Sequence, residues 1–172
     1  HPRDPLVVEF AEPDGGRWAI LAAHFKSRGG CPDAGDLDRG EGCWAQRRER
    51  QSESLLQWLS GYAMLPADDY PMLVLADFNA YAKEAAMQAW AAAGFIDLIA
   101  QEIPAADRYT YIYRGQSGYL DHALATPAMR ERMTSIALWP INADEPEYLG
   151  RLGHGIWRAS DHDPMVIDLR LP

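Results

Sequence analysis

The chain has 172 residues, of which 48% are hydrophobic and 24% are charged, and its formal net charge is −9. This length is that of one ordinary domain with a buried core, and the composition excludes a disordered or fibrous protein. The negative charge argues against a protein that packages nucleic acid through a broadly basic surface. No apolar run approaches the ~20 residues that a membrane-spanning helix needs, so no membrane span is expected.

The first part of the chain predicts a hairpin followed by a helix. Apolar runs over residues 6–11 and 18–25 flank the turn-forming segment Pro13-Asp14-Gly15-Gly16, a spacing typical of two antiparallel strands. A helix is then predicted over residues 45–62, because one side of a 3.6-residue repeat is lined by Arg48, Gln51, Ser52, Leu55, Leu59 and Tyr62. The basic start of this helix, with Arg47 and Arg48, faces either solvent or a phosphate-bearing ligand.

Two cysteines, Cys31 and Cys43, lie in a loop rich in Gly and Asp between the hairpin and the helix. In a secreted protein they would form one disulfide, whereas in a cytosolic protein they would be two free thiols. A zinc site is not expected, because there is no second cysteine pair and the five histidines are scattered.

The second half predicts several strands and one more helix. A continuous apolar run over residues 71–76 is typical of a strand buried on both faces. An Ala-rich helix is expected over residues 83–93, ending before Gly94. Four further strands are expected over residues 109–113, 119–125, 135–141 and 164–171, the first two forming a second hairpin. This mixture of strands and helices indicates a mixed α/β class with sheet cores.

Polar residues lie at the ends of several predicted strands, where their side chains can converge. Asp77 and Asn79 are two residues apart and would share one face of an extended segment. Asp121 lies within an apolar strand, and a buried carboxylate costs several kcal/mol unless it is paired. The candidate site residues are His24, Asp77, Asn79, Asp121, Asp161 and His162.

Each candidate has a simpler interpretation when it is taken alone. Asp77 could be a turn former, His24 a packed imidazole and Asp161 a loop cap. As a set, however, they combine oxygen ligands of the kind that hold Mg²⁺, Mn²⁺ or Ca²⁺ with imidazoles that an Asp can orient. This chemistry suits metal-dependent phosphodiester hydrolysis. A serine hydrolase built on Ser160 is disfavoured, because adjacent Ser, Asp and His in an extended chain cannot face one centre.

Six stretches of the sequence resemble the endonuclease/exonuclease/phosphatase superfamily, which has the fold of pancreatic deoxyribonuclease. They are AHFKSRG (23–29), GCWAQRRERQ (42–51), VLADFNAYAKE (74–84), YTYIYRGQSGYLDHALA (109–125), WPINADEP (139–146) and ASDHDPMVIDL (159–169). Within the superfamily the chain is most similar to bacterial secreted nucleases. The resemblance implies an α+β fold with a two-layer β-sandwich flanked by helices.

The resemblance also implies a domain that is longer than this chain. Residues 1–172 are expected to be the C-terminal portion of a single domain that is incomplete at its N-terminus. The family's N-terminal half supplies a metal-binding Asn and Glu, which have no counterpart before His24. The missing half would come from the same protein or from another chain.

The resemblance implies a role for each candidate in catalysis. His24 would contact the scissile phosphate, and Asp77 and Asn79 would position the attacking water and the phosphate or the metal. His162, oriented by Asp121, would act as the base or as the main group that stabilises the phosphate. The remaining implied roles are metal ligation by Asp161 and Asp77, substrate binding by Asn79, and contacts of Arg47 and Arg48 with the nucleic-acid backbone.

The implied function is a secreted, low-specificity endonuclease that cleaves DNA, with RNA as a second candidate substrate, using Mg²⁺, Mn²⁺ or Ca²⁺. Cys31 and Cys43 would form the disulfide of secreted members, and the protein would be extracellular or periplasmic. Two alternatives stay open: a lipid or small-molecule phosphodiesterase of the same fold, and a catalytically incomplete fragment or subunit.

Overall fold

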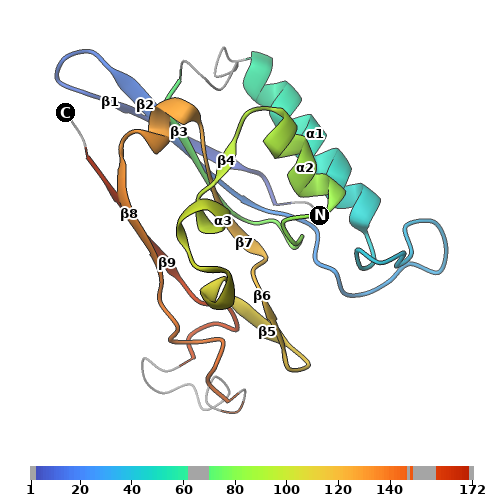
Figure 1. The fold of residues 1–172 in the computed structure, drawn as a ribbon. Helices are drawn as coiled ribbons and strands as arrows, with labels where there is room; N and C mark the ends of the chain where they lie inside the picture. The colour runs from blue at the N-terminus through green and yellow to red at the C-terminus, as the bar shows by residue number, and fades with distance from the viewer. Residues whose placement is uncertain (1–2, 62–69, 147, 149–157, 171–172) are drawn as a thin grey trace.

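A five-stranded sheet forms the centre of the molecule (Figure 1). The computed structural model describes residues 3–61, 70–146, 148 and 158–170. The strands lie in the order β1-β2-β3-β7-β4, with β2 parallel to β3 and the other neighbours antiparallel. Their bounds are Leu6–Ala11 (β1), Arg17–His24 (β2), Met72–Asp77 (β3), Ile96–Asp97 (β4) and Asp121–Ala125 (β7).

The structure confirms the first predicted hairpin. β1 pairs with β2 in antiparallel register, from Leu6 opposite Ala22 to Ala11 opposite Arg17. In the turn, the backbone N–H of Gly15 donates to the carbonyl of Glu12 at 3.0 Å, and Gly15 has a φ of 90°. A glycine adopts this backbone conformation without the steric clash that a Cβ would cause.

Two helices, α1 (Ala45–Gly61) and α2 (Ala85–Ala92), cover one face of the sheet. The buried residues of α1 recur with the predicted helical period and are Arg48, Ser52, Leu55 and Leu59. Both predicted helices are therefore present, although the expected last residue of the first one, Tyr62, lies outside the described residues. Among the helices of the described ranges, none has both the length and the apolar character needed to cross a bilayer.

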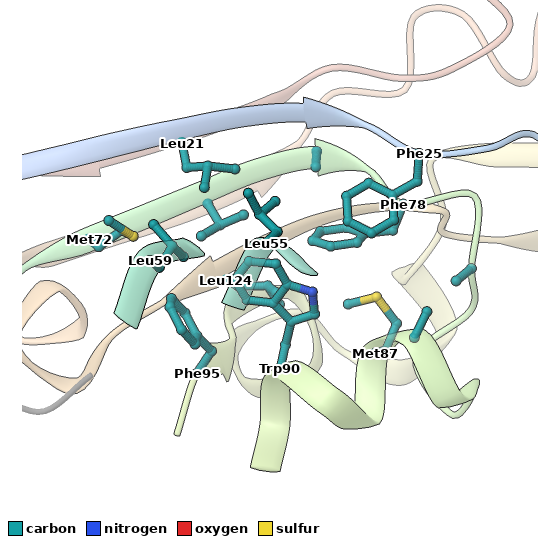
Figure 2. Close-up of a cluster of buried hydrophobic side chains, with 14 of the residues drawn as sticks. Leu21, Phe25, Leu55, Leu59, Met72, Phe78, Met87, Trp90, Phe95 and Leu124 are labelled. Atoms are coloured by element: carbon teal, nitrogen blue, oxygen red, sulfur yellow. The ribbon is translucent and has the colours of Figure 1, made fainter. Parts of the chain in front are cut away.

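The core under these helices is built around Trp90 of α2 (Figure 2). The indole is fully buried, and its ring centroid lies 5.7 Å from that of Phe78 and 5.0 Å from that of Phe95. Its Nε1–H donates to the hydroxyl of Ser52 at 3.1 Å, so the polar atom of the ring is satisfied. Each large apolar side chain buried in this way contributes roughly 1.5–3 kcal/mol, and the cluster fixes α1 and α2 on the sheet.

The opposite face of the sheet packs against a hairpin of β8 (Met133–Leu138) and β9 (Met165–Leu169). The predicted two-layer sandwich is therefore present, with a second layer of two strands in the described part of the chain. This layer does not reach β1, where Leu6, Val8 and Phe10 are 60%, 40% and 37% exposed.

Leu171, the expected end of the last strand, lies outside the described residues. The remaining elements are short: α3 (Leu98–Glu102), η1 (Ala105–Asp107), β5 (Tyr111–Tyr113), β6 (Gln116–Gly118) and α4 (Pro127–Arg130).

The second predicted hairpin exists, but its returning arm is not the predicted one. β5 pairs with β6 across a turn at Arg114 and Gly115, which have φ values of 51° and 78°. Two consecutive residues with positive φ form the tight turn whose twist suits a two-residue hairpin, so the chain reverses directly after β5. The segment predicted as the second arm, 119–125, instead supplies β7 to the central sheet.

The cysteine loop is closed by a disulfide between Cys31 and Cys43, with an S–S distance of 2.06 Å. The structure thus forms the disulfide and not the alternative pair of free thiols. The loop is also fastened to α1, because the guanidinium of Arg48 donates to the carbonyls of Cys43 at 2.8 Å and Glu41 at 2.7 Å. Beyond these bonds the loop buries few apolar side chains, so the covalent link is an important restraint on it.

Removal of the disulfide is expected to lower the free energy of unfolding by about 3 kcal/mol, because the unfolded chain regains the entropy of a short closed loop. The measurement is thermal unfolding followed by circular dichroism, with and without reductant. The double variant Cys31→Ser/Cys43→Ser should melt like the reduced wild type and should not respond to reductant. A wild-type melting temperature that reductant leaves unchanged would contradict the prediction.

Candidate active site

The register of three strands places three polar residues side by side at one end of the central sheet. His24, the last residue of β2, is paired with Asp77, the last residue of β3, and Asp77 is paired with Asp121, the first residue of β7. Paired residues point to the same face of a sheet. That face is the one covered by β8 and β9, because Asp77 alternates with Leu75 and Leu73, which pack there.

His162 completes this row from the loop before β9. An isolated β-bridge to Tyr111 holds its backbone, and its Nδ1 lies 2.6 Å from Oδ2 of Asp121. The hydroxyl of Thr110 donates to the same carboxylate oxygen at 2.6 Å. An ionised carboxylate only accepts hydrogen bonds, so Nδ1 carries a proton. The other ring nitrogen, Nε2, makes no hydrogen bond to the described residues and is the one left for a substrate.

The charges of this row shift the pKa values of two of its members. Burial by itself lowers the pKa of His162, but the hydrogen bond and charge of Asp121, with the charges of Asp77 and Asp161, outweigh burial and raise it. The pKa of Asp77 is raised by its burial and by the neighbouring charge of Asp121, against the hydrogen bond from the backbone of Asn79 and the two imidazoles. Shifts of this kind gather at functional sites.

His24 is held between a cation and a carboxylate. Its Nε2 lies 3.4 Å from Oδ2 of Asp77, and its Nδ1 contacts the guanidinium of Arg3. A guanidinium only donates, so Nδ1 accepts and the ring proton lies on Nε2. Arg3 is not among the predicted site residues, because no local pattern links it to a histidine that is 21 residues away.

Asn79 does not share an extended face with Asp77, contrary to the prediction. Its φ is 51°, so the chain turns directly after the strand. Its backbone N–H donates to Oδ1 of Asp77 at 2.8 Å, and its side-chain amide donates to the carbonyl of Phe25 at 3.4 Å. Asparagine tolerates this left-handed backbone better than most residues. Asn79 thus orients the carboxylate of Asp77 and ties the ends of β2 and β3 together.

The donor atoms at the site fit a hard divalent cation. Ligand atoms of Asp77, Asp121 and His162 lie within 4.8 Å of one another. Burial, and after it the neighbouring charge of Asp121, raise the pKa of Asp77, and a cation beside the two carboxylates would relieve their repulsion. Carboxylate oxygens suit Mg²⁺, Mn²⁺ or Ca²⁺. Asp161, the predicted direct ligand, is exposed and lies outside this group of three, although its charge reaches His162.

The two arginines predicted to touch a nucleic-acid backbone have different surroundings. Arg47 lines a groove beside His24, so it faces the site. Arg48 is fully buried, and its guanidinium lies 3.4 Å from Oε2 of Glu84 in addition to its bonds within the disulfide loop. The prediction for Arg48 is wrong, because a buried guanidinium held by these partners cannot reach a phosphate in solvent.

Two further residues, neither of them among the predicted site residues, hold the backbone of His162 and the segment next to it. The side-chain amide of Asn142 donates to the carbonyl of His162 at 2.7 Å. One carboxylate oxygen of Asp163 accepts the backbone N–H groups of Ile141, Asn142 and Ala143 at 3.0, 2.7 and 2.9 Å. Both residues lie in stretches that carried the family resemblance, but a bond between loops 20 residues apart leaves no local pattern.

A buried histidine supports the site from the other face of the sheet. His122 is fully buried; its Nδ1 lies 2.9 Å from Oδ2 of Asp97, and its Nε2 lies 2.9 Å from the carbonyl of Ala80. Alternation along β7 sends Asp121 to one face and His122 to the other. His122 therefore takes no part in the row, but it anchors the loop that follows Asp77.

The sequence matches the model of the Endonuclease/Exonuclease/phosphatase family over residues 3–162. A search of curated proteins gave no match. Among solved structures, an AP endonuclease from Archaeoglobus fulgidus is 19% identical, with a TM-score of 0.60 over 89% of this chain and 62% of that one. An endonuclease/exonuclease/phosphatase from Bacteroides vulgatus is 17% identical, with a TM-score of 0.62 over 98% of this chain and 55% of that one.

A third match is a mannosyl-6-phosphatase from Bacteroides thetaiotaomicron, 13% identical, with a TM-score of 0.58 over 97% of this chain and 57% of that one. At such identities the likeness shows the fold alone, and it confirms the predicted α+β class. The chain spans less than two thirds of the length of each of these three structures.

Asp121→Asn is expected to lower the imidazole pKa of His162, because a neutral amide replaces the carboxylate that favours the imidazolium. The measurement is an NMR pH titration of the ring in metal-free protein. The pKa of His162 is higher in the folded protein than its ordinary value of 6.5. The charged pair with Asp121 therefore stabilises the fold fully below pH 6.5, and this stabilisation is lost as pH rises through the pKa of the folded protein.

The matched control is Asp33→Asn, which removes an exposed carboxylate from the disulfide loop and should leave the titration unchanged. An unchanged pKa of His162 in the Asp121→Asn protein would show that the pair does not form in solution.

Proposed function

This chain belongs to the endonuclease/exonuclease/phosphatase family, and we propose on that premise that its candidate active site hydrolyses phosphodiester bonds of nucleic acid with a divalent cation. The observation that carries the proposal is the row of His24, Asp77, Asp121 and His162 across the ends of three paired strands and one loop. The row combines a carboxylate that can accept a proton with two imidazoles that can donate hydrogen bonds to a substrate.

Each group of the row has a role in the proposed reaction. Asp77, whose pKa is raised by burial and by Asp121, takes a proton from the attacking water. Nε2 of His162, on a ring whose pKa is raised overall, stabilises the negative charge that develops on the phosphoryl oxygens. Nε2–H of His24 donates to a further oxygen of the substrate, while Arg3 and Asp121 hold the two imidazoles in place.

The cation would be held on the exposed side of the site by Asp161, whose charge reaches His162, with water completing its coordination. The carboxylate of Asp77 then stays free to take the proton. When bound, the cation neutralises charge on the phosphate and on the leaving oxygen. Mg²⁺ is the proposed ion, and Mn²⁺ and Ca²⁺ share its preference for oxygen ligands.

Nucleic acid is the proposed substrate, cleaved with low sequence specificity. Among the matched structures, the name AP endonuclease supports a nucleic-acid substrate. The net charge of −9 is compatible with a nuclease that makes few phosphate contacts and binds with a shallow salt dependence. The disulfide supports a place outside the reducing cytosol, in the extracellular space or the periplasm.

The direct test is nicking of supercoiled plasmid by the 172-residue chain, with Mg²⁺ or Mn²⁺ and with excess EDTA. We expect nicking that requires the metal and that falls at least about tenfold in Asp161→Asn, because a ligand oxygen is lost. Asp33→Asn, the same change at an exposed position of the disulfide loop, should nick like the wild type. Parallel assays with a phosphate monoester and with sphingomyelin distinguish a phosphatase and a lipid phosphodiesterase. No nicking under any of these conditions would overturn the proposal.

His162→Ala is expected to lower the nicking rate at least about a hundredfold, because it removes a group that acts on the transition state. The variant loses the pair with Asp121, so the melting temperature should fall below pH 6.5 and change less at higher pH, where the pair no longer stabilises the fold. Free imidazole should restore part of the activity if the ring acts chemically. A rate equal to that of the wild type would remove His162 from the mechanism.

A further inference from the structure

A groove of about 500 Å³ lies beside His24, between residues 3–5, the end of β2 and one face of α1. A second hollow of about 260 Å³ adjoins it and shares Arg3, His24, Phe25, Arg47 and Gln51. We call the two together the α1 groove. In Figure 1, the segment that leads into β1 lies near the first turns of α1, and its residues 3–5 line the groove together with Arg47 and Arg50. The groove opens onto the row of catalytic candidates through His24.

Positive charge predominates in the α1 groove, where Asp4 is the only acidic side chain among the described lining residues. Lys26, Arg47 and Arg50 line it, and none of the three forms an ion pair with the described residues. Burial lowers the pKa of Lys26, and the charges of Arg47 and Arg48 lower it further. In a chain of net charge −9 this local excess of cations is notable, and a bound anion would relieve their repulsion.

The groove also has an aromatic and apolar wall farther along α1. Leu55 and Trp58 line it, and Trp58 is 39% exposed. Arg47 and Trp58 are 11 residues apart on one helix, which places them about 16 Å apart along its axis at ~1.5 Å per residue. The duplex rise is about 3.4 Å per nucleotide, so this face is long enough for more than one nucleotide. Cations thus lie near His24 and an indole lies at the far end.

We propose that the α1 groove binds the nucleotides next to the scissile phosphate of a single nucleic-acid strand. Arg47 and Arg50 bind its phosphates, and Trp58 stacks on a base. This inference rests on the proposed function and adds a binding track to its reaction centre. A groove of about 500 Å³ is the size of a small-ligand site, so it takes a single strand and not a duplex.

The test is binding of a short, 5′-labelled single-stranded oligonucleotide, followed by fluorescence anisotropy in EDTA so that no cleavage occurs. In Arg47→Ala/Arg50→Ala the affinity should fall at least about tenfold. The slope of log K against log salt should flatten by about 1.4, because two phosphate contacts are lost and each contributes ~0.7 on a single strand. Trp58→Ala should weaken binding about fivefold without changing the slope, and Trp58→Phe should restore most of the affinity.

Arg50→Ala alone is the second variant, because Arg50 is exposed and its loss leaves the fold intact; about half of the change in slope is expected. The matched control is Arg39→Ala, an exposed arginine of the disulfide loop that lines neither hollow, and it should bind like the wild type. If the wild type nicks plasmid but the double variant keeps the wild-type affinity and salt slope, the α1 groove does not bind the strand and the proposed function still stands. A wild type that neither binds the oligonucleotide nor nicks plasmid overturns both.

Discussion

The pairing of three strands, β2 with β3 and β3 with β7, sets the position of every group in the candidate site. Parallel strands end at the same edge of a sheet, so β2 and β3 bring His24 and Asp77 together. β7 runs the other way, so its first residue and not its last, Asp121, joins them. A shift of this register by one residue would send each of these side chains to the helix-covered face. The apolar core on both faces of the sheet therefore also aligns the catalytic candidates.

The loops at this edge are held by buried polar groups and not by apolar packing. The buried ring of His122 bridges two segments, with one nitrogen 2.9 Å from the carboxylate of Asp97 and the other 2.9 Å from the carbonyl of Ala80. One carboxylate oxygen of Asp163 gathers three consecutive backbone N–H groups in front of the site. Such bonds fix loop geometry within tenths of an ångström, which a catalytic group needs from the residues behind it.

Charge is distributed unevenly in this acidic chain. Carboxylates predominate in the site, whereas arginine and lysine side chains predominate in the α1 groove beside it. His24 lies where the two regions meet, with the carboxylate of Asp77 on one ring nitrogen and the guanidinium of Arg3 on the other. A phosphodiester backbone bound to a metal ion would complement both regions at once. The net charge of the chain, −9, gives no sign of this division, because it sums over the whole surface.

The sequence by itself determined the class of the fold, the strands over 6–11 and 71–76 and the site candidates at strand ends, because hydrophobic periodicity and polar residues at strand ends are local signals. Only the tertiary structure decided that Arg48 is buried, that Asn79 turns out of the strand and that residues 119–125 pair with β3. It also decided that Asp161 lies outside the cluster of potential ligands. The physical reason is that each of these outcomes depends on partners far along the chain. Packing between elements decides whether the guanidinium of Arg48 meets Glu84 or solvent, and no local pattern of residues indicates the result.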